Sequence, residues 1–114
     1  MARGQKKSQA EIVKDSFLVF PEAESDIKEA YLWYEGRRPG LGEEFILSLE
    51  AAFSAIQRQP ELYQIVYEQV RRELIKRFPY GVFYVYENEE IVVLAVFHIR
   101  RDPKMWQKRV SSQS

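Results

Sequence analysis

Two segments with helical spacing of apolar residues occupy the first half of the chain. The first follows Pro21, and its acidic residues Glu22, Glu24 and Asp26 lie near its start, where the helix dipole favours negative charge. The apolar stripe of the second consists of Phe45, Leu49, Ala52, Phe53 and Ile56. Residues 36–42, which separate the two segments, include three glycines and one proline. So short a break predicts an antiparallel helical hairpin.

Runs typical of β-strands precede and follow this hairpin. Residues 16–20 form a short apolar run. Later, apolar and charged residues mix over 70–77, β-branched and aromatic residues fill 82–86, and 91–98 is almost entirely apolar. We therefore expect an α+β fold with an N-terminal strand, the antiparallel helical hairpin and a three-stranded antiparallel meander. All of the strands would form one mostly antiparallel sheet, with the hairpin on one face.

The 114 residues are enough for one domain, which we place at 16–109. Residues 1–15 and 110–114 lack periodicity, and we expect both to be flexible tails. No apolar run approaches the ~20 residues of a membrane helix, and the polar N-terminus does not resemble a secretory signal, so we expect a cytoplasmic protein. The absence of cysteine excludes disulfides and thiolate chemistry. A single histidine without a ligand-like spacing of partners argues against a metal cofactor.

The formal net charge is zero, but the charges are unevenly distributed. Nine acidic and four basic residues lie between Glu22 and Glu61, whereas six acidic and nine basic residues lie from Leu62 onward. This division predicts a basic working surface on an acidic support, although solvated helices explain the first half equally well. Strong general attraction to nucleic acid is not expected of a neutral chain.

Chemically useful side chains concentrate in the last third of the chain. His98 ends an apolar strand, where it could transfer a proton near neutral pH or simply cap the strand. By alternation along residues 70–77, Arg71 and Arg77 share one face, and Arg72 and Lys76 share the other. Because the helices should cover one face, only one of these pairs can line an open surface. The alternative is a solvated strand edge.

Tyr80, Tyr84 and Tyr86 alternate along one strand and should point to one side of it. We expect this row to pack on the sheet or to receive a partner peptide, rather than to stack on nucleobases. We likewise expect Trp33 and Trp106 to be packing anchors.

Two ordered sets of residues carry a family resemblance. The first set comprises Asp26-Ile27, Ala30, Trp33-Tyr34-Glu35 and Pro39 to Phe45. The second comprises Pro60, Arg71-Arg72, Phe78-Pro79-Tyr80, Val96-Phe97-His98, Arg101-Asp102-Pro103 and Trp106. Over roughly residues 17–109 they resemble the RelE/ParE superfamily, the toxins of type II toxin–antitoxin modules, also called plasmid stabilisation proteins. The resemblance implies the fold predicted above and a cognate antitoxin as protein partner.

The resemblance also implies one of two growth-arresting activities. RelE-like members cleave mRNA in the ribosome without a metal, and ParE-like members inhibit DNA gyrase. In the first case the RNA 2′-OH would attack the adjacent phosphate. His98 and Tyr80 would then transfer protons, and Arg71, Arg77 and Arg101 would bind the phosphate. The sequence leaves the target open between ribosome-bound mRNA and gyrase. A non-toxic member that only binds an antitoxin or a nucleic acid is the alternative.

Overall fold

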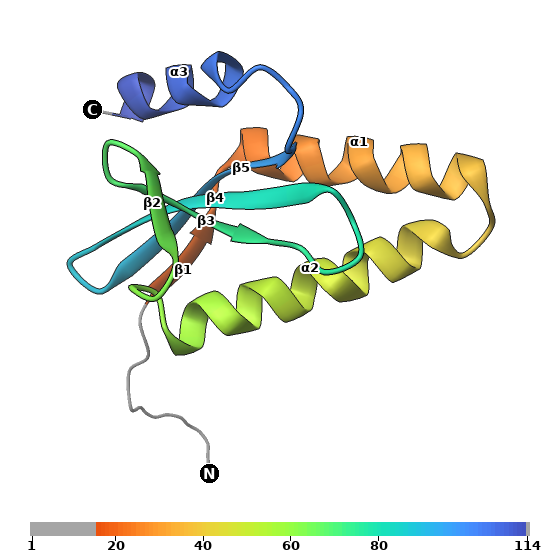
Figure 1. The fold of residues 1–114 in the computed structure, drawn as a ribbon, viewed down its shortest axis with the longest axis horizontal. Helices are drawn as coiled ribbons and strands as arrows, with labels where there is room; N and C mark the ends of the chain where they lie inside the picture. The colour runs from red at the N-terminus through yellow and green to blue at the C-terminus, as the bar shows by residue number, and fades with distance from the viewer. Residues whose placement is uncertain (1–15, 114) are drawn as a thin grey trace, which may run out of the picture.

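In the computed structural model, which describes residues 16–113, the chain forms three helices and one five-stranded sheet. The elements in chain order are β1 (Ser16–Val19), α1 (Pro21–Arg37), α2 (Leu41–Arg58), β2 (Gln64–Tyr67), β3 (Val70–Leu74), β4 (Tyr80–Glu87), β5 (Glu90–His98) and α3 (Lys104–Gln113). The tail expected at residues 1–15 lies outside the described residues. Figure 1 shows α1 and α2 joined at one end as a hairpin, as the periodicity predicts.

The strands are arranged in the order β1-β5-β4-β3-β2. β1 pairs with β5 in parallel, whereas β2, β3, β4 and β5 form a continuous antiparallel series. The expected α+β fold, with its helical hairpin and mostly antiparallel sheet, is therefore confirmed. The long apolar run of β5 is explained by its position between two strands, where nearly all of its side chains are buried.

Both faces of the sheet are covered. The helical hairpin packs on one face, where Phe45 and Ile56 of α2 meet Val82 and Val93 of the sheet. The other face holds a second apolar cluster, which includes Trp106 of α3. Two layers of helix therefore enclose the central strands, and the side chains of β4 alternate between the two clusters.

Three features differ from the sequence predictions. α3 was not expected, and it extends to Gln113, so the flexible tail predicted from Val110 is helical as far as that residue. β2 is an additional edge strand, so the predicted meander of three strands contains four. β3 ends at Leu74, three residues before the end of the predicted strand.

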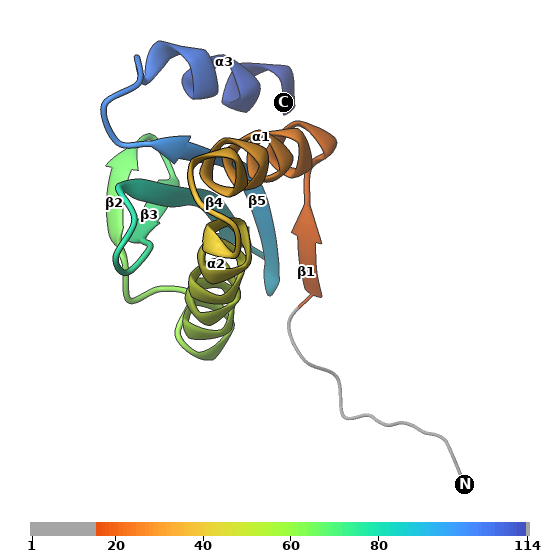
Figure 2. The ribbon, with the colours of Figure 1, turned by 90° about the vertical axis from the view of Figure 1, so that its right-hand side faces the viewer.

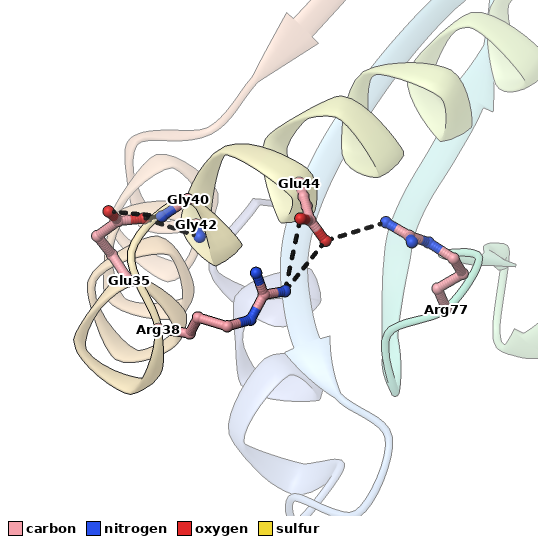
Figure 3. A network of polar contacts seen from close by, with 6 residues as sticks. All are labelled: Glu35, Arg38, Gly40, Gly42, Glu44 and Arg77. Atoms are coloured by element: carbon pink, nitrogen blue, oxygen red, sulfur yellow. Dashed lines mark hydrogen bonds and ion pairs between the residues drawn. The ribbon is translucent and has the colours of Figure 1, made fainter.

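The turn between α1 and α2 is held by side chains from both helices (Figure 3). The carboxylate of Glu35 accepts hydrogen bonds from the backbone N–H groups of Gly40, at 3.0 Å, and Gly42, at 3.0 Å. Gly40 has a φ of 91°, a left-handed conformation that glycine adopts without a steric penalty. Since the first N–H groups of a helix lack partners within it, Glu35 supplies the acceptor that α2 needs.

A β-bulge interrupts β5 near its middle. Phe83 pairs with Ala95, but the next residue of β4, Tyr84, pairs with Val93, so Leu94 has no partner on β4. The extra residue gives β5 two successive side chains, Leu94 and Ala95, in the cluster beneath α3. Bulges of this kind bend a strand and redirect the residues that follow it.

A buried ion pair holds the bulge to both adjacent helices. Asp26 of α1 is only 7% exposed, and its carboxylate accepts hydrogen bonds from the Val96 N–H at 3.0 Å and from Arg109 Nη1 at 2.7 Å. Arg109, on α3, also donates to the carbonyl oxygen of Leu94 at 2.9 Å. Figure 2 shows α3 lying next to α1. This Asp26–Arg109 clasp therefore connects three elements that the sequence separates by up to 83 positions.

Candidate functional site

Three of the five predicted site residues meet at the end of β5. Tyr80 and His98 are register partners on β4 and β5, and their ring centroids lie 5.3 Å apart. Arg101 follows in the next turn, where its guanidinium carbon lies 4.1 Å from the centroid of the Phe97 ring. Antiparallel pairing thus brings residues from the start of one strand and the end of the next into contact.

Two clefts adjoin this point. The α1 cleft, of about 460 Å³, is lined by Asp26, Glu29, Ala30, Trp33, Tyr34, Tyr80, Val96, His98 and Arg101. The α3 cleft, of about 220 Å³, is lined by Val66, Arg72, Phe83, His98, Ile99, Arg101, Pro103, Trp106 and Gln107. His98 and Arg101 line both clefts. A ligand on either side of the sheet end would therefore meet these two residues.

The α1 cleft combines aromatic rings with charges of both signs. Burial raises the pKa of the Tyr80 phenol, the Arg101 charge lowers it, and Glu29 and Asp26 raise it. A raised pKa keeps the phenol protonated at neutral pH, so Tyr80 is a hydrogen-bond donor rather than a proton acceptor there. The two carboxylates in the same cleft oppose the entry of a phosphate group.

The His98 ring is already hydrogen-bonded on one side. Its Nδ1 atom accepts the backbone N–H of Arg100 at 3.0 Å. In the neutral ring the hydrogen therefore lies on Nε2, which acts as a donor. To act as a general base, His98 would have to give up this bond or change its tautomer. The local geometry therefore favours a donating histidine over a proton-accepting one.

Arg71 lies away from both clefts. Its Nη1 atom donates to the carbonyl oxygens of Glu61, at 2.9 Å, and Tyr63, at 2.8 Å. The Tyr84 hydroxyl donates to the neighbouring Pro60 carbonyl at 2.6 Å. These bonds fasten the connection between α2 and β2 to the sheet, so the Arg71 guanidinium is used for structure.

Arg77 is also separated from the group around His98. It lies beyond the end of β3 with a φ of 71°, so the alternation that was expected to place it with Arg71 no longer applies. Its Nη2 atom lies 3.5 Å from Glu44, which also pairs with Arg38 (Figure 3). Arg77 thus joins an exposed ion-pair network on α2.

The tyrosine row of β4 faces the helical hairpin. Tyr80, Tyr84 and Tyr86 all belong to the cluster beneath α1 and α2, and Tyr84 is fully buried, which confirms the packing interpretation for this residue. Trp106 is also buried, as expected. Trp33 is 54% exposed, so its prediction as a packing anchor is wrong.

Tyr84 should make the stability depend on alkaline pH. Burial raises its pKa to about 12, opposed by Arg71 and supported by Tyr63 and Glu73. Because the folded-state pKa exceeds the unfolded value of 10.0, this contribution is complete below pH 10 and is lost as the pH rises through 12. Urea unfolding should therefore show a steeper loss of stability between pH 10 and 12 in the wild type than in Tyr84→Phe. Parallel curves for the two proteins would contradict this assignment.

The residue that sequence reasoning missed is Arg72. It pairs with Phe83 and lines the α3 cleft with His98 and Arg101. Gly81 gave a sequence signal for the position of Arg72, because a glycine within a strand often marks a place where another group approaches the backbone closely. A Cβ atom at Gly81 would lie 3.0 Å from Arg72 Cγ and 3.1 Å from its Cδ. The Arg72 stem therefore lies across β4 where a side chain would obstruct it.

Among residues 16–113, no group of three or more histidine, aspartate or glutamate side chains is arranged to hold a metal ion. None of the helices within this range has the length and apolar character required to cross a membrane.

Solved structures of toxin–antitoxin complexes share this fold. One chain of the chromosomal ParDE system from P. aeruginosa superposes with a TM-score of 0.66 at 16% identity, covering 73% of this chain and 94% of that chain. One chain of the RelBE2 toxin–antitoxin complex from Mycobacterium tuberculosis gives 0.51 at 18% identity, covering 81% and 98%. A comparison with curated proteins finds no match. The helical hairpin and five-stranded sheet are thus a fold that this chain shares with chains of these two toxin–antitoxin systems.

A match to a family model identifies the family of the chain. The model for the ParE toxin of the type II toxin–antitoxin system parDE matches residues 18–103. This range contains the helical hairpin and the strands of the sheet, apart from the first residues of β1. The chain therefore belongs to the ParE toxin family of type II toxin–antitoxin systems.

Proposed function

We propose that this ParE-family toxin arrests growth by inhibiting DNA gyrase and that a cognate antitoxin neutralises it. The parDE family match supports the gyrase-directed branch. The similar solved chains come from toxin–antitoxin complexes, which supports an antitoxin partner.

The dispersal of the residues predicted for RNA cleavage is the observation that carries this proposal. Arg71 and Arg77 are engaged in structural contacts, away from the end of β5. His98 already accepts a hydrogen bond on Nδ1, and Tyr80 has a raised pKa. A metal-independent nuclease needs a proton acceptor and cations around one phosphate. Of the residues predicted for RNA cleavage, none is therefore a ready proton acceptor, and only Arg101 could hold the phosphate, whereas a gyrase inhibitor needs neither function.

The order of events in cells tests the proposal. After induction of the toxin alone, plasmid DNA should lose negative supercoiling before protein synthesis declines, and both effects should be absent when the cognate antitoxin is co-expressed. Topoisomers would be resolved on chloroquine gels, and synthesis would be followed by pulse labelling. A collapse of protein synthesis while supercoiling is still normal would support ribosomal mRNA as the target instead.

Substitution of His98 separates the two activities further. Gyrase inhibition requires no proton transfer by the toxin. His98→Ala should therefore inhibit gyrase within about threefold of the wild type, which is the effect expected from losing one peripheral contact. A nuclease would lose about 10²–10⁴-fold in cleavage rate. Growth arrest by the wild type and by His98→Ala, at matched protein levels, would be compared over a series of inducer concentrations. Complete loss of toxicity in soluble, folded His98→Ala would argue for a chemical role of the histidine.

Trp33 is the strongest candidate for a contact with the antitoxin. The ring is 54% exposed, lines the α1 cleft and carries the Arg37 guanidinium 4.4 Å from its centroid. Large exposed aromatic side chains at clefts frequently dominate binding energy. Trp33→Ala should therefore weaken binding of the cognate antitoxin by about 2 kcal/mol, measured by calorimetry. Leu47→Ala, a similarly exposed apolar position on α2, serves as the control, and equal effects would refute a specific role.

A further inference from the structure

The Arg72 side chain has no evident structural use. No hydrogen bond or ion pair of its guanidinium is found within residues 16–113, although the residue is partly buried at the α3 cleft. This distinguishes it from its neighbour Arg71, whose guanidinium is bound to two carbonyl groups. A guanidinium without a partner among these residues can donate to an external acceptor, for which its five N–H groups are suited.

The surroundings of Arg72 hold further positive charge. Arg101 lines the same cleft, and the Phe97 ring, at 4.1 Å, holds its guanidinium in place. His98 also lines this cleft, with Nε2 as the donor in its neutral ring. No carboxylate is among the side chains that line this cleft, in contrast to the α1 cleft with Asp26 and Glu29. The α3 cleft therefore offers an anion the hydrogen-bond donors of Arg72, His98 and Arg101, set among apolar residues.

We propose that the α3 cleft binds a backbone phosphate of a nucleic-acid strand through Arg72 and Arg101. The planar guanidinium fork matches two phosphate oxygens, which gives Arg an advantage over Lys at such a site. At about 220 Å³ the cleft is smaller than the usual range of about 300–1,000 Å³ for pockets that enclose a small molecule. It suits one phosphate group at the surface of a longer ligand.

The site binds the strand without cutting it. No carboxylate lines the α3 cleft, and Nδ1 of His98 is occupied, so the bound phosphate meets donors but no proton acceptor. This property is independent of the gyrase proposal: a nucleic acid could be held whichever target the toxin poisons. It is compatible with a toxin that acts on an enzyme already bound to DNA.

Binding of labelled oligonucleotides tests the site directly. Fluorescence anisotropy would compare the wild type with Arg72→Ala, using single-stranded DNA and RNA of one sequence as probes. We expect Arg72→Ala to weaken binding about tenfold and to lower the salt slope by about one. Arg100→Ala is the matched control, because it removes the same charge from an exposed position that lines neither cleft. It should change affinity less than threefold.

Two conservative variants separate a specific loss of binding from the effects of misfolding and of a change in net charge. Arg72→Lys should retain most of the salt slope but lose affinity, because an ammonium lacks the fork. Gly81→Ala should weaken binding with no change of charge, since the new Cβ would press on the Arg72 stem. Similar binding of the DNA and RNA probes is expected from a phosphate contact, and preference for one of them identifies the natural source. Equal losses for Arg72→Ala and Arg100→Ala, or no binding by the wild type, would overturn the proposal.

Discussion

Replacing Asp26 with alanine should lower the free energy of unfolding by about 3–5 kcal/mol, the cost of removing one partner from a buried ion pair. The substitution removes the acceptor of the Val96 N–H and leaves the Leu94 carbonyl as the one hydrogen-bond acceptor of Arg109 within residues 16–113. Because the Arg109 side chain is only 20% exposed, water cannot fully replace the lost carboxylate. Urea denaturation followed by circular dichroism would measure the change.

Two further variants show whether the loss of stability in Asp26→Ala comes from the buried ion pair. Glu50→Ala removes an exposed carboxylate from α2 and should change stability by no more than about 0.5 kcal/mol. Asp26→Asn retains an acceptor for the Val96 N–H but removes the charge, so its loss should fall between those of Asp26→Ala and the control. A cost below about 1 kcal/mol for Asp26→Ala would show that the clasp does not hold the helices to β5.

Trp106→Ala should cost about 3–5 kcal/mol, as expected for removal of a buried tryptophan. The Trp106 ring is 4% exposed and stacks on Phe83 with the centroids 4.4 Å apart. It is the main apolar contact between α3 and the sheet, with Val110 one turn further on. Loss of the ring should release α3 and open the α3 cleft, so oligonucleotide binding should weaken as well.

Trp33 provides a matched control for this experiment. Trp33→Ala deletes the same side chain from an exposed position and should cost about 1 kcal/mol or less, because only the contacts with Tyr34 and Arg37 are lost. Hydrogen exchange would show whether the amides of α3 lose protection selectively in Trp106→Ala. Equal stability of the two variants would contradict the docking of α3 through Trp106.

The elements predicted correctly are those with strong local patterns. The helical hairpin follows from the 3.6-residue spacing and the glycines between its arms, and β5 follows from its continuous apolar run. α3 was missed because its apolar contribution to the cluster on the sheet comes from Trp106 and Val110, at a spacing of four, while most of the helix is polar. β2 was missed because it is a short edge strand in which Ile65 is half exposed.

Part of the candidate site could also be predicted, because some of its geometry follows from local sequence patterns and some requires the complete fold. The neighbouring positions of Tyr80 and His98 follow from pairing two successive strands, which the sequence shows. The choice of Arg71 and Arg77 over Arg72 depended on which face the helices cover and on where β3 ends. Neither is encoded in local alternation: Leu74 ends the strand, and the turn gives Arg77 a left-handed conformation. The pairing of Asp26 with Arg109 requires the complete fold and has no local signal.

Parallel assays of the purified toxin test the target most directly. One would measure supercoiling of relaxed plasmid by gyrase, and the other would measure cleavage of a defined mRNA on translating ribosomes by primer extension. Addition of the purified cognate antitoxin should reverse the effect of the toxin. We predict inhibition of supercoiling that depends on toxin concentration, with the mRNA intact at the same concentrations. Cleavage of ribosome-bound mRNA together with unimpaired gyrase would contradict the proposed function.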